Sequence, residues 1–175
     1  MTSALVLGDA DCVFADAEAA LKLFTPDLVA ACNNIGIRWE GRVDHWFTLH
    51  PRQCVDWEGI ELAVNRRVRE GRNKPITWAH KAMPGIDRST DDWLGSTGLL
   101  AVKALREIGC DKIVLAGVPM TEDGAHYYSK AKWAQARRYH RGWMNHQKEI
   151  APYVRSLSGW TGHTFGAPDE AWFHQ

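Results

Sequence analysis

The segment Gly95-Ser-Thr-Gly98 is the part of this sequence best suited to hold an anion. It directly precedes an apolar run with helical spacing, so its backbone N–H groups are expected in the first turn of a helix. Unpaired N–H groups and the positive end of the helix dipole attract a phosphate or a carboxylate. Ser96 and Thr97 add hydroxyl donors, and Gly98 lets the backbone approach a ligand closely. The alternative is an ordinary Ser/Thr helix cap without a ligand.

Two aspartates follow the first apolar run, in the turn Gly8-Asp-Ala-Asp-Cys12. The turn lacks the G-x-G-x-x-G pattern of dinucleotide-binding proteins, and the chain has no G-x-x-x-x-G-K-[ST] phosphate loop. Asp9 and Asp11 could hold Mg²⁺ together with the phosphates of a ligand. Capping of the following helix is the alternative interpretation of both residues.

Amide and imidazole side chains stand at the ends of other apolar runs. Asn33 and Asn34 offer donors and acceptors that can contact a base or a ribose, although consecutive Asn residues are also common in turns. His50, His80 and His126 follow predicted strands, which makes each a candidate general base. A single His is more often structural, and no His spacing typical of a metal site is present.

Short apolar runs alternate with segments of helical spacing along the whole chain, and these elements must position the polar residues. The alternation is typical of an α/β protein, and we expect a single Rossmann-like domain over residues 1–175, with a mostly parallel sheet and flanking helices. The predicted strands are 4–7, 28–32, 43–49, 75–79 and 112–116, and the predicted helices are 13–24, 54–70, 97–108 and 125–150. Residues 81–95 are expected to form a loop, and 156–175 a closing tail.

Ligands bind parallel sheets outside the carboxyl ends of the strands. This rule predicts that the segments 8–12, 33–36, 96–98 and 117–128 meet around one ligand, together with His50 and His80.

The composition narrows the classes of partner. Lys plus Arg and Asp plus Glu each number 21, a balance that argues against a nucleic-acid-binding protein. The cysteines are scattered without a C-x-x-C pair, so neither a zinc site nor a disulfide framework is expected. No apolar run approaches the roughly 20 residues of a membrane span, and the N-terminus has no basic segment typical of a signal peptide. We expect a cytoplasmic protein without a membrane partner, whose oligomeric state the sequence leaves open.

One local basic segment interrupts the balanced charge. It contains Lys130, Lys132, Arg137, Arg138 and Arg141, with aromatic residues between them, and is predicted to lie on the helix 125–150. A solvated helix face is the default interpretation, and a surface for phosphates or a polyanion is the alternative.

Residues 95–109 and the following 111–117 resemble a segment of bacterial sialyltransferase-like proteins and of the related archaeal hydroxymethylpterin pyrophosphokinase-like Rossmann proteins. Shorter pieces at 5–8, 31–34 and 44–51 follow in the matching order, so the resemblance covers about residues 4–130. The chain departs from the family in its first loop, which is not G-x-G-x-S, and at Pro119, where an acidic residue is usual. Its small size would fit a phage or prophage gene.

The resemblance implies a cytidine nucleotide as the donor of a transferred group. It assigns contacts with this nucleotide to the residues that match the family's pattern, which are Gly8, Asn33, Ser96, Thr97, Gly98 and Tyr127.

The leading hypothesis is therefore a transferase, of glycosyl groups if the resemblance holds, that uses a nucleotide-activated donor. The N–H groups at 96–98 would stabilise the phosphate of the leaving nucleotide, and His50, His80 or His126 would act as general base. One alternative is a non-catalytic module that binds a nucleotide or another phosphorylated metabolite. The other is phosphoryl or pyrophosphoryl transfer with Mg²⁺ on Asp9 and Asp11. Apart from that Mg²⁺, no cofactor is expected besides the nucleotide or nucleotide-sugar ligand.

Overall fold

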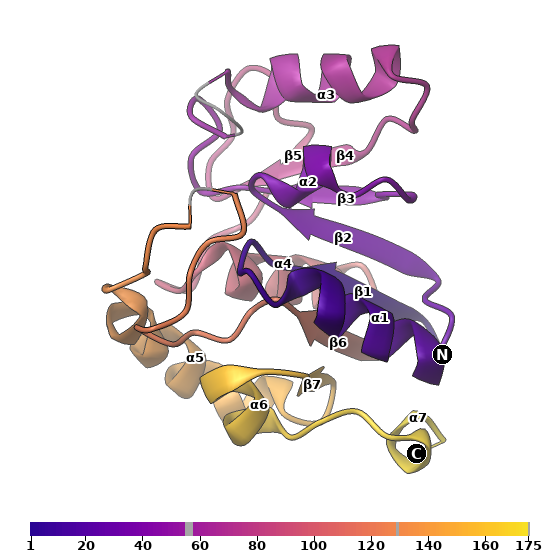
Figure 1. Ribbon diagram of the computed structural model, residues 1–175, viewed down its shortest axis with the longest axis vertical. Coiled ribbons are helices and arrows are strands. Elements are labelled where there is room, and N and C mark those ends of the chain that lie inside the picture. Colours follow the sequence, from indigo (N-terminus) through magenta and orange to yellow (C-terminus); the bar gives the residue numbers. More distant parts are fainter. Residues whose placement is uncertain (55–57, 129, 175) are drawn as a thin grey trace.

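The computed structural model describes residues 1–54, 58–128 and 130–174. A seven-stranded sheet with the order β5-β4-β3-β2-β1-β6-β7 runs through the molecule, and all its neighbouring strands are parallel (Figure 1). The strands are β1 (Ser3–Leu7), β2 (Leu28–Cys32), β3 (His45–Phe47), β4 (Ile76–Ala79), β5 (Arg88–Ser89), β6 (Lys112–Ala116) and β7 (Val154–Ser156). The helices are α1 (Val13–Leu23), α2 (Ile35–Arg38), α3 (Ile60–Arg69), α4 (Thr97–Glu107), α5 (Ala136–Ile150), α6 (Gly159–Phe165) and α7 (Glu170–Phe173).

Helices cover both faces of the sheet. The buried side chains of α1, α2, α3 and α7 pack on one face, together with Leu5 and Leu7 of β1. Those of α4, α5 and α6 pack on the other face, together with Ala4 and Val6 of the same strand. Alternate residues of a strand point to opposite faces, so a strand covered on both sides must be apolar throughout. This requirement explains the unbroken apolar runs, and the structure confirms the predicted α/β fold with a parallel sheet.

The predicted bounds agree best with the observed ones for β2, β6 and the start of α4. β2 and β6 have the predicted ends, and α4 begins at Thr97 as expected. β3 is shorter than the predicted strand 43–49. The predicted helix 54–70 begins late, because Gly59 at φ +79° precedes the first helical residue Ile60. Residues 55–57 of that prediction lie outside the described residues.

The predicted helix 125–150 is wrong over its first part, because α5 begins only at Ala136. Before it, Ala125 pairs with Lys132 in an antiparallel bridge, and Lys130 adopts a positive φ of 54°. Contacts with the turn after β1 hold this stretch in place, and such tertiary contacts outweigh local helix propensity. Lys130 and Lys132 therefore do not share a helix with the arginines of α5.

Two predicted loops contain regular structure. The loop 81–95 contributes the edge strand β5, and the tail 156–175 begins in the edge strand β7 and continues into α6 and α7. Gly159 and Gly166, both at positive φ, stand at the two ends of α6. The glycines of the tail suggested irregular structure, but Gly159 and Gly166 instead mark the two ends of a short helix. No helix in the described part of the chain is long and apolar enough to cross a membrane.

Candidate functional site

β1 and β6 are neighbours in the sheet, and the chain leaves them in opposite directions. β1 leads to β2 on one side, whereas β6 leads to β7 on the other. In open α/β sheets such a switch in strand order leaves a crevice at the carboxyl ends, where ligands bind. The turns after these two strands therefore mark the candidate site.

Two glycines bring these turns into direct contact. The Gly8 N–H donates to Ala116 O at 2.7 Å, and the Ala10 N–H donates to Gly117 O at 3.2 Å. A Cβ on Gly8 would lie 2.0 Å from Gly117 O, and one on Gly117, at φ +68°, would lie 2.5 Å from Cβ of Val13. Neither position accepts a side chain, so Gly8 is required by the packing of the two turns.

A cavity of about 280 Å³ opens at this point. Most of the residues predicted to bind or catalyse contribute to its wall, namely Gly8, Asp9, Asn33, His50, Ser96, Thr97, Gly98 and His126. The predicted convergence of the strand-end loops is thus visible in the geometry. Among the described residues, His80, Asn34 and Tyr127 do not line the cavity, and neither does the exposed Asp11. Of the two aspartates considered for Mg²⁺, only Asp9 therefore lines the cavity.

The N-terminus of α4 faces this cavity without a side-chain cap. Ser96 precedes the helix in an extended conformation, but its side chain makes no capping hydrogen bond. Instead, Nε1 of the buried Trp143 donates to Ser96 Oγ at 3.2 Å, and Thr97 Oγ1 donates to Asn33 Oδ1 at 3.4 Å. The N–H groups of a first helical turn have no acceptor within the helix. The ordinary Ser/Thr cap is absent, and this helix end remains open to an anion in the cavity.

Asp9 is the most unusual polar group in the cavity wall. Its side chain is only 8% exposed. Asn34 Nδ2 donates to Oδ2 at 3.0 Å, and His126 Nδ1 lies 3.9 Å from the same oxygen. The other carboxylate oxygen, Oδ1, is buried without a hydrogen-bond partner among the described residues. Burial raises the pKa of Asp9 to about 6, an effect that Asn34, His126 and Arg38 partly offset.

The turn that carries Asn33 and Asn34 is held in place by Trp46 of β3. Asn33 adopts a positive φ of 51°, and its carbonyl accepts a hydrogen bond from Trp46 Nε1 at 2.7 Å. The ring of Trp46 packs directly against Gly36, where a Cβ would lie 1.9 Å from the ring. Trp46 therefore fixes both the Asn turn and the short helix α2 that follows it.

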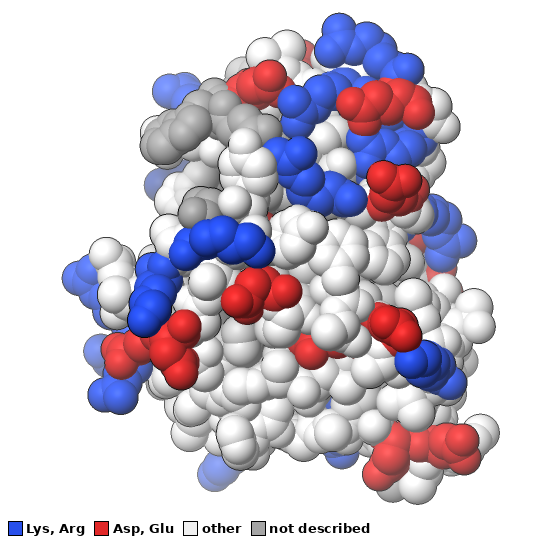
Figure 2. Space-filling view, viewed as in Figure 1, with Lys and Arg blue, Asp and Glu red and all other residues white. Residues whose placement is uncertain are grey.

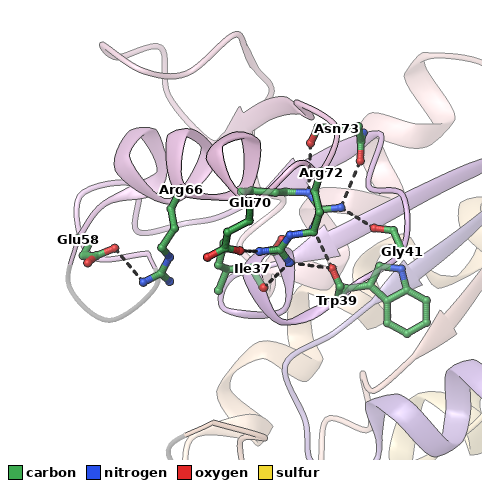
Figure 3. A network of polar contacts seen from close by, with 10 residues as sticks. Ile37, Trp39, Gly41, Glu58, Arg66, Glu70, Arg72 and Asn73 are labelled. Carbon is green, nitrogen blue, oxygen red and sulfur yellow. Dashed lines mark hydrogen bonds and ion pairs between the residues drawn. The ribbon is translucent and has the colours of Figure 1, made fainter.

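Two arginines cap the carbonyls at the far end of α2. The fully buried Arg67 donates to Gly36 O and Trp39 O, at 3.0 and 2.8 Å, and to Gly41 O. Figure 3 shows Arg72 reaching Ile37 and Trp39 from the end of α3, while Glu70 pairs with its guanidinium. Burial lowers the pKa of Arg67 to about 10, so Arg67 stays charged at neutral pH. Cationic donors at a helix C-terminus satisfy its free carbonyls and its dipole.

The stretch after β6 closes the opposite side of the cavity. The Tyr127 N–H donates to Asp9 O at 2.8 Å, the Asp11 N–H donates to Ala125 O at 2.9 Å, and Ala10 pairs with His126. Tyr127 thus acts on the site through its backbone, because its ring packs on Phe14. These contacts fix His126 beside Asp9.

Two aromatic residues that sequence reasoning did not assign to the site also line the cavity. The rings of Trp133 and Tyr139 stack with centroids 5.3 Å apart, and the His126 ring lies 5.9 Å from Trp133. They were overlooked because both were placed inside one long helix. No local sequence signal separates Trp133 from the helix that follows it.

Positive side chains are scarce in the cavity wall. No Lys or Arg lies among the described residues that line it, and its only basic side chains are His50 and His126. Lys and Arg gather instead over α3, interleaved with acidic residues, as Figure 2 shows. No group of three or more His, Cys, Asp or Glu is placed to hold a metal ion within the described ranges.

No protein-family model, curated protein or solved structure matches this chain.

Proposed function

We propose that this protein is a transferase that uses a nucleotide-activated donor, and that the nucleotide of the donor carries a single phosphate. The observation that carries the proposal is the uncapped N-terminus of α4, which opens into a cavity at the switch point of the sheet.

The phosphate of the donor is assigned to the first turn of α4. There Ser96, Thr97 and Gly98 line the cavity, and their available donors are the N–H groups of Thr97 and Gly98 and the hydroxyl of Ser96. Since Ser96 Oγ accepts its hydrogen bond from Trp143, its own proton is available to a phosphate oxygen. Donors fixed in this way stabilise the charge that develops on the nucleotide as it leaves. The lack of Lys and Arg favours a monophosphate-linked donor over a diphosphate-linked one.

The remaining walls suit the uncharged parts of a donor. Asn33 accepts from Thr97 through Oδ1, and its Nδ2 has no hydrogen-bond partner among the described residues, so it is available to a base or a ribose. Trp133 and Tyr139 offer a flat apolar surface, on which a base or the face of a sugar ring can pack.

The proposal narrows the histidines considered for catalysis. His50 and His126 line the cavity, whereas His80 does not. His126 is also the histidine that lies beside Asp9. Mg²⁺-dependent transfer is not proposed, because Asp11 is exposed outside the cavity.

The proposal is tested by incubating the protein with CMP-, UDP- and GDP-linked sugars and following release of the nucleotide by chromatography. We expect slow hydrolysis of a CMP-linked sugar and little or none of the diphosphate-linked ones. The double variant S96A/T97A should lower this rate roughly tenfold or more, because the hydrogen bond from the Ser96 hydroxyl to the charged phosphate and the bond from Thr97 that orients Asn33 are both lost. The matched control is S89A/T90A, which removes the same hydroxyls outside the cavity. Nucleotide binding without turnover of any donor would contradict transfer and favour the non-catalytic module.

A further inference from the structure

Asp9 combines three properties that a purely structural carboxylate rarely has together. Its side chain is more than nine-tenths buried, it lines the cavity, and Oδ1 has no hydrogen-bond partner in the described part of the chain. Buried carboxylate oxygens in native proteins normally have hydrogen-bond partners, so the unsatisfied Oδ1 of a residue that lines the cavity favours a functional role for Asp9. Asn34 holds the other oxygen, so the carboxyl group cannot turn freely.

We propose that Asp9 is the catalytic base that accepts the hydroxyl proton of the acceptor, and that His126 is its positioning partner. This inference rests on the proposed transferase function. In the reaction, the acceptor oxygen forms a bond to the transferred carbon while the bond from that carbon to the phosphate oxygen breaks. The electron pair of the broken bond leaves with the nucleotide, and the hydroxyl proton moves to the carboxylate of Asp9.

The surroundings of Asp9 suit this role. A carboxylate with a pKa of about 6 is largely ionised at neutral pH yet is a stronger base than an ordinary aspartate. The charged groups that act on Asp9 are Arg38 from α2 and His126 from the stretch after β6. The thiols of Cys32 and Cys54 also face Asp9, and their pKa values are raised mainly by burial and further by its negative charge. The hydrogen bonds from Asn34 and the charges of His126 and Arg38 favour the charged form of Asp9.

His126 keeps this base in place without a direct hydrogen bond. Its Nδ1 lies 3.9 Å from Asp9 Oδ2, and its backbone is paired with Ala10 in an antiparallel bridge. At this separation His126 lowers the pKa of Asp9 through its charge without occupying Oδ1.

The first experiment measures the pKa of Asp9, and the effect of His126 on it, in the ligand-free protein. Carbon-13 NMR of labelled Asp carboxyls should contain one signal with a midpoint near pH 6, which D9N removes. The midpoint should rise in H126Q, because a positive neighbour is lost. A spectrum in which D9N removes only a signal in the ordinary Asp range would overturn the inference.

The second experiment separates proton transfer from nucleotide binding. With the CMP-linked sugar as substrate, the wild-type rate should rise with pH through about 6, and D9N should lower it about 100-fold or more and abolish this rise. The affinity of D9N for CMP should be unchanged or higher, because an anion beside the phosphate site is removed. D11N is the matched control, since it alters an exposed aspartate of the same turn.

The outcomes distinguish the two proposals. If D9N turns over the donor within twofold of the wild-type rate while S96A/T97A weakens CMP binding, the role of Asp9 is wrong and the proposed function stands. If the wild-type protein binds no CMP and hydrolyses no donor, the proposed function itself fails.

Discussion

At the scale of single residues, the buried carboxylate of Asp9 lowers the stability of the fold in the ionised form that the proposed reaction requires. Its pKa is about 6 in the folded protein, against 3.8 for an ordinary Asp, so the folded state binds this proton more tightly than the unfolded state does. The resulting contribution to stability is fully present below about pH 4 and is lost as the pH rises through 6. At neutral pH the buried carboxylate therefore destabilises the fold. Residues that lower stability in this way are characteristic of functional sites.

This effect predicts that D9N is more stable than the wild-type protein at neutral pH. A shift of about two pKa units corresponds to about 3 kcal/mol, so the free energy of unfolding at pH 7.5 should increase by about 1–3 kcal/mol. At pH 4, where Asp9 is protonated in the folded state, the two proteins should differ little. Urea denaturation at both pH values measures the difference, with D11N as control. The same difference at both pH values would contradict the proposed ionisation.

The sequence predicted that Asp9 lies at the site but not its protonation behaviour. Its position after the first apolar run was sufficient to place it at a strand end. Its burial depends on Ala125 and His126, which are more than one hundred residues away in sequence and were assigned to a helix. A pKa set by such a long-range contact cannot be derived from the local pattern of residues.

At the scale of elements, the close approach of the turns after β1 and β6 depends on Gly8. We predict that G8A destabilises the protein by about 3 kcal/mol or more, because the added Cβ would lie 2.0 Å from Gly117 O. Gly71 provides the control. It has a positive φ of 80° but nothing within 4 Å of an added Cβ, so G71A should cost only the backbone strain of about 1 kcal/mol. Thermal and urea denaturation would compare them, and equal losses would argue against the contact between the turns.

A second element-scale prediction concerns the arginine that caps α2. R67M keeps much of the side-chain volume but removes the donors to Gly36 O, Trp39 O and Gly41 O. Because buried carbonyls are left unsatisfied, we expect a loss of about 2–4 kcal/mol, measured by urea denaturation. R69M, which changes an exposed arginine on the same helix, should stay within about 0.5 kcal/mol of the wild type. A small effect of R67M would show that α2 and the Asn turn do not depend on Arg67.

Element boundaries were predictable where local signals and packing agree. Gly95-Ser-Thr-Gly98 before an apolar stripe predicted the start of α4, and Gly109 its end. The start of α5 was not predictable, because the residues from 125 onward have acceptable helix propensity and are held in a loop by the turn after β1. Trp133 was for this reason not recognised as part of the cavity wall.

At the scale of the whole molecule, the alternation of apolar runs predicted a parallel sheet but not the order of its strands. An apolar run does not specify which strand it will pair with in the sheet. The sequence therefore could not predict that the chain returns after β5 to place β6 beside β1. That return creates the switch point and brings the turn after β6 to Asp9. The sequence also indicated overall neutrality, but not that Lys and Arg are absent from the described residues that line the cavity.

The central claim is that the cavity at this switch point binds a nucleotide through the N-terminus of α4. The most direct measurement is calorimetric titration of the wild-type protein, S96A/T97A and S89A/T90A with CMP, without Mg²⁺. We predict saturable binding to the wild type and to S89A/T90A, and at least about tenfold weaker binding to S96A/T97A, equivalent to about 1.4 kcal/mol. No binding to the wild-type protein, or equal binding to all three proteins, would contradict the claim.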